Sequence, residues 1–234
     1  MADLSAFPIT NRWPAADSGV IQLYSYPTPN GIKISTMLEE TGLPYEPHRV
    51  TLAEADVKSP EFLSLNPNNK IPAIIDPNGP DGAPIGLFES GAILIYLAEK
   101  TGRFLGKTTT DRYRIIQWLM FQMGGVGPMF GQVGFFVRYG GTAVTDPLPR
   151  ERYLNEMKRL LGVIEGTLDG RDWIAGDYSI ADMAIAPWLR AIPDGYDVAD
   201  LVDWESFPRV NAYLARFLER PAVQRALDIP PRAG

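Results

Sequence analysis

The chain has 234 residues, and its 22 lysines and arginines against 28 aspartates and glutamates give a net charge of −6. This length can bury the core of one large domain or of two small ones. Hydrophobic residues make up 45% and charged residues 21%, which excludes a disordered, collagen-like or coiled-coil chain. Because binding nucleic acid requires positive charge, the acidic balance predicts no nucleic-acid partner.

The sequence shows no sign of a membrane span or a targeting signal. The longest apolar run, 91–98, is far shorter than the roughly 20 residues that cross a bilayer. Residues 1–18 carry Asp3, Asp17 and two prolines without an apolar block, unlike a secretory signal. We therefore expect a cytoplasmic protein with no membrane partner.

Cysteine is absent, and His48 is the single histidine. The chain therefore cannot form a disulfide, a cysteine metal site or a cysteine nucleophile. A catalytic triad and a multi-histidine metal site also lack their residues, so we expect no metal.

An irregular arm, 1–19, precedes a domain of alternating strands and helices, 20–104. Residues 21–26 alternate like a half-buried strand and stop at the turn 27–31. A helical pattern then runs to Gly42. The other expected elements are strands over 45–52, 71–75 and 85–88 and helices over 60–65 and 90–100. Their order is βαβαββα, typical of an α/β domain.

Strand signals stop after Gly102, and 105–234 is expected to be an all-helical domain. The linker between the two domains is expected near 103–110. Two glycine-rich breaks interrupt the pattern between a helix near residue 120 and a longer one that ends near residue 168. Ser179 and Asp182 have the spacing of a capping box at the start of another helix. The expected fold is thus α/β followed by all-α.

Thr28 and Asn30 stand between the first strand and the first helix. Backbone N–H groups and the helix dipole favour an anion there, and both side chains can donate hydrogen bonds. Such donors stabilise a thiolate and lower the pKa of a thiol. A simpler interpretation is that the two residues only cap the helix and shape the turn, and position alone does not separate the two.

The segment Asn69-Lys-Ile-Pro72 places a proline at the start of an expected strand. Pro72 cannot donate a ladder hydrogen bond, so the backbone of Ile71 is available to an extended peptide. A cis Ile71–Pro72 bond would mark a deliberate feature. The alternative is an ordinary edge-strand proline, with Lys70 either holding a carboxylate or simply solvated.

Glu89 and Ser90 lie between the last strand and its helix. Ser90 can bind a carboxylate at the helix start and Glu89 can pair with an ammonium, although Ser90 can equally serve as a helix cap. Three polar sites thus lie at strand ends of one small sheet, where ligands of such sheets bind. Together they fit a thiol, a peptide backbone and an amino-acid head group, as in glutathione.

Two parts of the chain resemble cytosolic glutathione transferases. The βαβαββα order, Asn69–Pro72 and Glu89–Leu97 resemble their thioredoxin-like N-terminal domain, and Gly176–Asp182 resembles a capping segment of their helical C-terminal domain. Thr28–Gly31, with Gln117-Trp118 and 125–128, is similar to the nu class, which includes bacterial disulfide-bond reductases. The resemblance covers about 20–230 and implies both domains of that fold.

The resemblance implies a role for each matching residue. Thr28 and Asn30 would contact the sulfur of glutathione and act as the catalytic residues. Ile71, before a cis Pro72, would pair with the cysteinyl backbone, and Lys70 would reach the glycyl carboxylate.

The resemblance also implies that Glu89 and Ser90 hold the γ-glutamyl end and that Arg152 lies close to bound glutathione. It implies a homodimer with active sites near the subunit interface. Arg150 and Arg152 stand at the start of a helix, where the dipole disfavours cations, and this favours a function for them. Neighbouring glutamates offer a structural explanation instead.

Other residues have simpler interpretations. Strand alternation makes Tyr24 and Tyr26 core or wall residues, and His48 is expected on the surface or in the core, not as a catalyst. An apolar pocket for a second substrate is expected where phenylalanines and methionines surround the first glycine break.

The leading functional hypothesis is glutathione-dependent thiol–disulfide exchange, because a chain without cysteine must take its thiols from glutathione. A thiolate held at Thr28 and Asn30 would attack a disulfide, and a second glutathione would complete the reaction. Whether one or two molecules bind at each site stays open. The alternatives are glutathione transfer to or from an electrophilic or aromatic molecule, and a binding module without activity.

Overall fold

The computed structural model of the chain describes residues 2–232. The chain divides into two compact units. One holds the described residues up to Thr101 together with those from Pro221 onward, and the other is Gly102–Arg220. The segment from Pro221, expected in the helical domain 105–234, is therefore grouped with the first unit. The expected domain ranges also include residues 1, 233 and 234, which lie outside the described residues.

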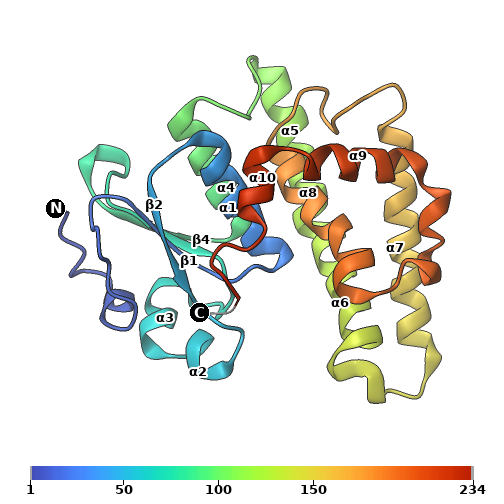
Figure 1. Ribbon diagram of the computed structural model, residues 1–234, viewed down its shortest axis with the longest axis horizontal. Coiled ribbons are helices and arrows are strands. Elements are labelled where there is room, and N and C mark those ends of the chain that lie inside the picture. The colour runs from blue at the N-terminus through green and yellow to red at the C-terminus, as the bar shows by residue number, and fades with distance from the viewer. Residues whose placement is uncertain (1, 233–234) are drawn as a thin grey trace. The chain divides into compact units, whose positions relative to one another are not determined.

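The first unit is built on a four-stranded sheet with the strand order β2-β1-β3-β4 (Figure 1). β1 pairs with β2 in parallel, whereas β3 is antiparallel to both β1 and β4. The strands are β1 (Ile21–Ser25), β2 (Tyr45–Arg49), β3 (Ala73–Asp76) and β4 (Ile85–Phe88). This mixed sheet confirms the expected thioredoxin-like fold.

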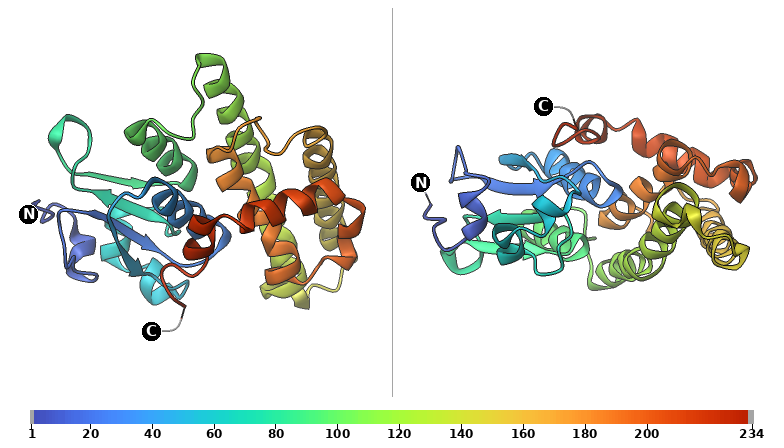
Figure 2. Two further views of the ribbon diagram at one scale, coloured as in Figure 1. Left: turned by 45° about the horizontal axis from the view of Figure 1, so that its top comes forward. Right: turned by 90° about the horizontal axis from the view of Figure 1, so that it is seen from below.

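Helices cover both faces of this sheet (Figure 2). Side chains alternate along a strand, so each face has its own core. Leu23 and Ile74 lie on one face and Tyr24 and Ala73 on the other, and all four are fully buried. The helices of this unit are α1 (Pro29–Thr41), α2 (Glu54–Val57), α3 (Pro60–Leu65), α4 (Ser90–Thr101), α10 (Pro221–Ala226) and the short turns η1 (Pro8–Asn11) and η2 (Pro80–Gly82).

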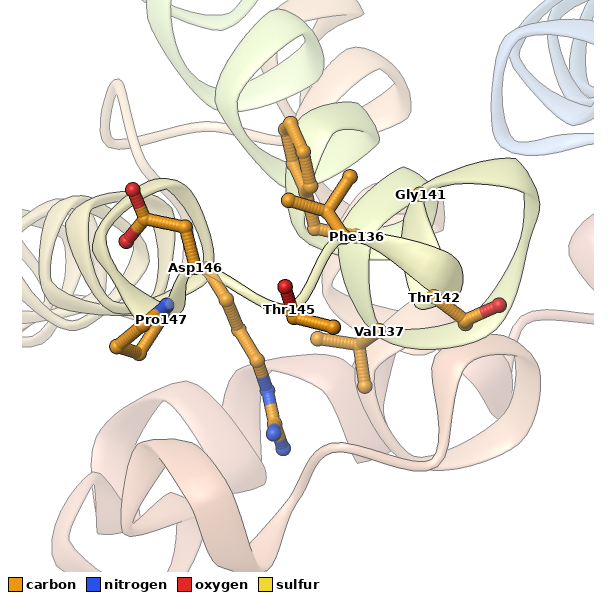
Figure 3. Close-up of a pocket in the computed structure, with 9 residues that line it drawn as sticks. Phe136, Val137, Gly141, Thr142, Thr145, Asp146 and Pro147 are labelled. Atoms are coloured by element: carbon orange, nitrogen blue, oxygen red, sulfur yellow. The ribbon is translucent and has the colours of Figure 1, made fainter.

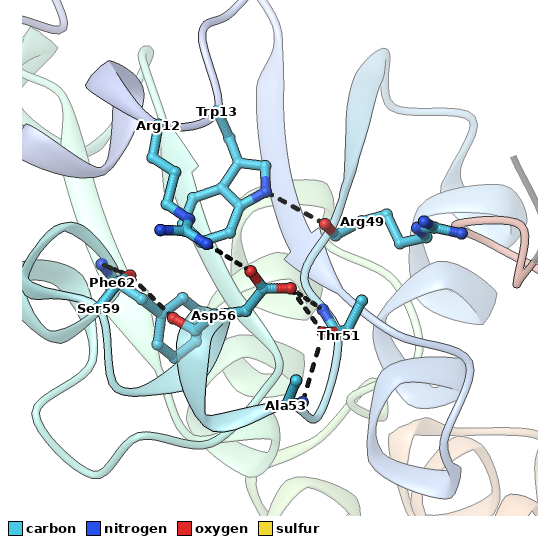
Figure 4. A network of polar contacts seen from close by, with 8 residues as sticks. All are labelled: Arg12, Trp13, Arg49, Thr51, Ala53, Asp56, Ser59 and Phe62. Atoms are coloured by element: carbon cyan, nitrogen blue, oxygen red, sulfur yellow. Dashed lines mark hydrogen bonds and ion pairs between the residues drawn. The ribbon is translucent and has the colours of Figure 1, made fainter.

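The N-terminal arm is packed and hydrogen-bonded, not loose. Leu4 and Ile9 are buried in the core shared by Tyr24 and α3. Figure 4 shows that Trp13 donates from Nε1 to the carbonyl of Arg49 at 3.1 Å, and that Arg12 pairs with Asp56 at 2.6 Å. The arm thereby holds the segment that follows β2. Among the described residues before β1, the structure assigns one regular element, η1.

The C-terminal segment is held to the first unit by hydrogen bonds and an ion pair. Ser35 of α1 donates from Oγ to the carbonyl of Ala226 at 2.9 Å. Arg225 pairs with Glu39 at 2.6 Å. The Arg232 guanidinium donates to the carbonyl of Pro27 at 2.9 Å. These contacts fix α10 against α1.

The second unit is helical throughout. Its main helices are α5 (Thr109–Phe121), α6 (Gly127–Arg138), α7 (Pro147–Thr167), α8 (Ile180–Ala191) and α9 (Pro208–Leu218), with shorter turns η3 (Gln122–Val126), η4 (Gly140–Ala143), η5 (Ile192–Tyr196), η6 (Asp200–Val202) and η7 (Trp204–Ser206). Among the described helices, none combines the length and apolar character that a membrane span needs.

The predicted capping box is present at the start of α8, where Asp182 is fully buried. Its carboxylate accepts hydrogen bonds from the backbone of Ile174 and of Ser179 at 3.0 and 2.9 Å, and from the hydroxyls of Ser179 and Tyr213 at 3.1 Å. Burial raises the pKa of Asp182 to about 6 against these hydrogen bonds. Asp182 thus joins the start of α8 to α9.

Two expectations need correction. The first glycine-rich segment does not break the helix: α5 and α6 join through η3, a π-helical turn whose flanking residues keep helical dihedral angles. Glycine serves close packing in α6 instead, because a Cβ at Gly134 would lie 2.5 Å from the ring of Tyr196. The third strand begins at Ala73, not Ile71.

Candidate functional site

The strand registers bring the expected glutathione-site residues of the first unit to one edge of the sheet. Ala73 lies opposite Tyr24 on one side and Phe88 on the other. Because β3 runs antiparallel to both neighbours, the start of β3 lies beside the ends of β1 and β4. The residues that follow β1, precede β3 and follow β4 therefore gather at this edge. We call it the site edge; it carries Thr28, Asn30, Lys70, Ile71, Pro72, Glu89 and Ser90.

Thr28 caps α1. Its hydroxyl oxygen accepts a hydrogen bond from the backbone N–H of Gly31 at 3.2 Å. A hydroxyl that accepts still has one hydrogen to donate, so the capping role and a role towards a thiolate are compatible. Asn30 follows in the first turn, half-buried. The two polar side chains lie where the N-terminal end of the helix favours negative charge.

Gly31 sets how closely this helix start approaches the sheet. A Cβ at this position would lie 1.9 Å from the carbonyl oxygen of Tyr26 and 2.7 Å from Oγ of Ser25. Only glycine fits such a contact. Thr28 and Asn30 are thereby held directly beyond the end of β1.

The second part of the site precedes β3. The Ile71–Pro72 peptide bond is cis, as expected. Both ladders of β3 end at Ala73, so the backbone of Ile71 takes no part in them. Asn66 donates from its amide to the carbonyl of Lys70, which orders the preceding turn. Lys70 itself is exposed.

The third part lies between β4 and α4. Glu89 has a φ of 69°, in the left-handed region, and its side chain is exposed. Its carbonyl accepts from the backbone of Ile93 at 3.0 Å, so it directly precedes the first turn of α4. Ser90 is the first residue of that helix and is 3% exposed. An exposed carboxylate and a hydroxyl at a helix start stand side by side.

A charged residue that the sequence analysis missed completes this corner. Lys33 of α1 is 0% exposed, and its Nζ donates to Oγ of Ser90 at 3.2 Å. Burial lowers the pKa of Lys33 to about 7, and the negative charge of Glu89 partly opposes this shift. The available signal was its spacing: Lys33 lies three residues after Asn30, on the same side of the helix.

Arg152 belongs to the second unit, in α7, and is exposed. Within residues 2–232 it makes no hydrogen bond or ion pair. Glu156, which offered a structural explanation for it, is engaged instead by Arg159 through two hydrogen bonds of 2.8 Å. The charge of Arg152 contributes only weakly to the lowered pKa of Glu156, which Arg159 dominates.

Tyr24 belongs to the core, as strand alternation predicted, and of the two positions left open for His48 the structure shows the core. Tyr24 is 0% exposed, and burial raises its pKa well above the ordinary range. The ring of His48 stacks on it at 4.7 Å between centroids, and its Nε2 lies 2.7 Å from Oε1 of Gln22. The described residues include no cluster of three or more histidines, aspartates or glutamates arranged to hold a metal ion.

A pocket in the second unit lies at the C-terminal end of α6 (Figure 3). It is not lined by the glycine-rich segment of η3, where the second-substrate pocket was expected. Its lining includes the apolar side chains of Phe136 and Val137 and the polar side chains of Thr142, Asp146 and Arg150. The ring of Phe136 also stacks on Tyr153 of α7. Of the aromatic residues expected around a second-substrate pocket, Phe136 lines this one, whereas Phe130 is fully buried in the core.

Two family models match the chain. The glutathione S-transferase N-terminal domain matches residues 19–99, and the C-terminal domain of the same family matches residues 136–221. The chain belongs to the glutathione S-transferase family. Its first unit is the thioredoxin-like half of that fold, and its second unit supplies the helical half.

Solved structures of similar proteins agree. A glutathione transferase from Pseudomonas putida is 60% identical, covers 97% of this chain and 99% of its own, and superposes with a TM-score of 0.96. One from Burkholderia graminis is 61% identical, covers 100% and 98%, and gives a TM-score of 0.97. The first was crystallised with one glutathione disulfide per subunit and the second with two glutathione molecules per subunit.

A similar protein is the disulfide-bond oxidoreductase YfcG of Escherichia coli. It is 45% identical over 210 residues, which span 89% of this chain and 94% of that protein. The similarity therefore extends over most of both chains.

Proposed function

We propose that this glutathione S-transferase family member is a glutathione-dependent thiol–disulfide oxidoreductase. The observation that carries the proposal is the gathering of complementary groups at the site edge of a chain that has no cysteine. Those groups match the thiol, the peptide backbone and the amino-acid head of glutathione. The relatives crystallised with glutathione or its disulfide, and the name of YfcG, support the same assignment.

Thr28 and Asn30 act on the sulfur. Thr28 uses its hydroxyl oxygen to cap α1, so its hydroxyl hydrogen is donated outward, and the amide of Asn30 adds N–H donors. Donors directed at a thiolate, next to the positive end of a helix dipole, favour ionisation of a thiol. The chain's own contribution to the chemistry is to hold an anionic sulfur at this position.

The rest of the site edge binds and orients the peptide. The backbone of Ile71, outside the β3 ladders and before the cis Pro72, pairs with the cysteinyl residue. Lys70 is placed to reach the glycyl carboxylate. Glu89 pairs with the ammonium of the γ-glutamyl end, and Ser90 donates to its carboxylate.

Bound glutathione supplies the redox chemistry: two glutathione thiols reduce one disulfide to two thiols and are themselves oxidised to glutathione disulfide. Arg152, exposed and without an ion pair among the described residues, is assigned to offset the negative charge of two tripeptides. The nu class is proposed from Thr28–Gly31 and from the similarity to YfcG. A homodimer is proposed together with this class. A cytoplasmic location is proposed as well, because thiol-based reduction suits a reducing compartment.

The test is glutathione-dependent reduction of hydroxyethyl disulfide by Asn30→Ala. Loss of a donor to the thiolate is expected to lower kcat/KM at least tenfold, which corresponds to about 1.4 kcal/mol of transition-state stabilisation. The matched control is Asn11→Ala, an exposed asparagine of η1 that is expected to leave the rate unchanged. Unchanged turnover in Asn30→Ala would contradict the assignment.

A substrate panel separates this function from glutathione transfer. Hydroxyethyl disulfide, a chloronitroarene and a glutathione thioether are compared at the same glutathione concentration. The proposal expects the disulfide to be turned over fastest. Activity confined to the other two compounds would favour transfer, with the pocket beside Phe136 as the place to examine first.

A further inference from the structure

We propose that Lys33 is a positioning residue that makes this site selective for the α-carboxylate of the γ-glutamyl group. It acts from behind Ser90: it sets the direction of the Ser90 hydroxyl and provides the buried positive charge for that carboxylate. This proposal rests on the proposed function, because it concerns the same ligand. It adds a residue of α1 to the part of the site formed by Glu89 and Ser90.

The geometry places an ammonium where no solvent reaches it. Lys33 is 0% exposed and Ser90 is 3% exposed, and their Nζ and Oγ atoms are 3.2 Å apart. Lys33 lies in α1, and Ser90 is the first residue of α4. Their hydrogen bond therefore joins these two helices. A buried ammonium is costly unless negative charge lies near it.

While Lys33 is charged, the direction of its hydrogen bond to Ser90 is fixed by chemistry. An ammonium has donors and no acceptor, so Ser90 must accept. The single hydroxyl hydrogen of Ser90 then points to an acceptor other than Lys33. Ser90 stands at the start of α4, where the dipole favours an anion, so a bound carboxylate can accept a hydrogen bond from this hydroxyl.

The charges around this corner match a zwitterion. Glu89 is exposed and negative, whereas Lys33 is buried behind Ser90 and positive. An α-amino acid head places its ammonium on Glu89 and its carboxylate on Ser90. A carboxylate oxygen that accepts from Ser90 at about 2.7 Å lies within about 6 Å of Nζ of Lys33, which is close enough for a direct effect on its protonation.

Other charged groups on the elements around α1 are engaged elsewhere. Arg225 of α10 pairs with Glu39 at the far end of α1. Asp76 of β3 pairs with Lys100 of α4 at 2.9 Å, and Tyr96 of α4 donates to the same carboxylate at 2.7 Å.

Three further groups complete the surroundings of α1. Arg232 donates to the Pro27 carbonyl, and Tyr24 of β1 keeps its hydroxyl hydrogen because burial raises its pKa above the ordinary range. Glu89 is the group whose charge acts on Lys33. A bound carboxylate would add a second negative charge beside it.

A consequence is that binding is coupled to a proton. Burial lowers the pKa of Lys33 to about 7, so above that pH the side chain is largely neutral in the free protein. A bound carboxylate stabilises the charged form and raises this pKa. Binding therefore takes up a proton above about pH 7, and affinity falls as the pH rises, by at most tenfold per pH unit for one proton.

The experiment measures the binding of S-methylglutathione by calorimetry between pH 6 and pH 9. This probe has no thiol, so ionisation of a thiol does not contribute to the proton uptake. We expect Lys33→Met to weaken binding about tenfold at pH 6, and the affinities of the two proteins to converge towards pH 9. The control is Lys58→Met, which removes an exposed lysine paired with Glu54 and should change neither affinity nor pH profile.

The second probe is the S-methyl 4-aminobutyryl analogue, which keeps the ammonium and lacks only the α-carboxylate. Lys33→Met should bind this analogue as well as the wild type does. An equal loss of affinity for both probes at every pH would show a merely structural role and overturn the proposal. Unchanged affinity for S-methylglutathione would overturn it as well.

A comparison in the wild type alone keeps the proposal testable if Lys33→Met does not fold. Proton uptake near pH 8, measured in buffers of different ionisation enthalpy, should accompany S-methylglutathione and be absent with the analogue. Equal uptake with both probes would contradict the role of Lys33. If the wild type binds neither probe at millimolar concentration, the proposed function itself fails, so the two failures are distinguishable.

Discussion

At the scale of one residue, Thr28 caps a helix and is also proposed to contact the ligand. Its oxygen accepts from Gly31, which confirms the capping interpretation, and its hydrogen can still be donated, so the proposed contact with the thiolate is compatible with the cap. Gly31 is what brings this hydroxyl close to the end of β1. The position of the cap, and hence of the thiol donors, depends on that glycine.

Gly31→Ala is predicted to damage both stability and binding. The added methyl would lie 1.9 Å from the carbonyl oxygen of Tyr26, a backbone atom, so α1 must move away from β1. We expect the free energy of unfolding to fall by about 3 kcal/mol and glutathione affinity to fall with it. Chemical denaturation and calorimetry provide the two measurements.

Gly162→Ala is the matched control. Gly162 lies inside α7, is exposed, and a Cβ there meets no atom within 4 Å. Because alanine is the better helix former, this variant should gain about 0.5 to 1 kcal/mol. A loss at Gly31 no larger than the change at Gly162 would show that the contact with Tyr26 does not constrain the site.

Some residues of the candidate site could be predicted from the sequence and others could not, for physical reasons. Thr28 and Ser90 were predictable because strand-to-helix junctions need caps and also favour anions. Lys33 was not, because a lysine inside an amphipathic helix usually reaches solvent, and only the packing of α1 against α4 buries this one. The positive φ of Glu89 likewise depends on how β4 turns into α4.

At the scale of elements, α10 shows how a short helix can be assigned to the wrong domain. Its sequence is helical, as expected, and it follows α9 directly in the chain. Its partner is nevertheless α1 in the first unit, through Ser35 and through the pairing of Arg225 with Glu39. Periodicity predicts a helix but does not specify which surface the helix covers.

Val223→Ala is predicted to test this packing. Val223 is 0% exposed in α10, so the truncation removes buried methyl groups and leaves a cavity. The expected loss in the free energy of unfolding is about 2 kcal/mol. Its exposed neighbour Gln224, changed to alanine, should alter it by less than about 0.5 kcal/mol. Equal effects at the two positions would contradict the packing of α10 against α1.

The glycines of η3 and α6 also show that packing can outweigh local preference. A cluster of glycines favours a break in a single-sequence prediction, since each one weakens a helix by roughly 1 kcal/mol. In the structure η3 continues the helix, and Gly134 lets the ring of Tyr196 approach the backbone. Packing against another element outweighs local preference here, and the sequence around Gly134 does not reveal that neighbour.

At the scale of the whole molecule, composition proved as informative as any motif. A chain with no cysteine and one histidine has few residues for covalent or metal catalysis. The order of strands and helices predicted the thioredoxin-like sheet, and its antiparallel β3 explains why three separate motifs meet at one edge. The proposed reductase function then rests on what those motifs are proposed to bind, not on a reactive side chain of the protein.

The central claim is that this protein ionises a thiol that belongs to glutathione. The most direct test is an ultraviolet titration of the thiolate of glutathione bound to the wild type and to the double variant Thr28→Val/Asn30→Ala. We predict that the bound thiol ionises at least one pH unit below free glutathione, and that the double variant loses this shift. A bound thiol that ionises at the same pH as free glutathione would contradict the account.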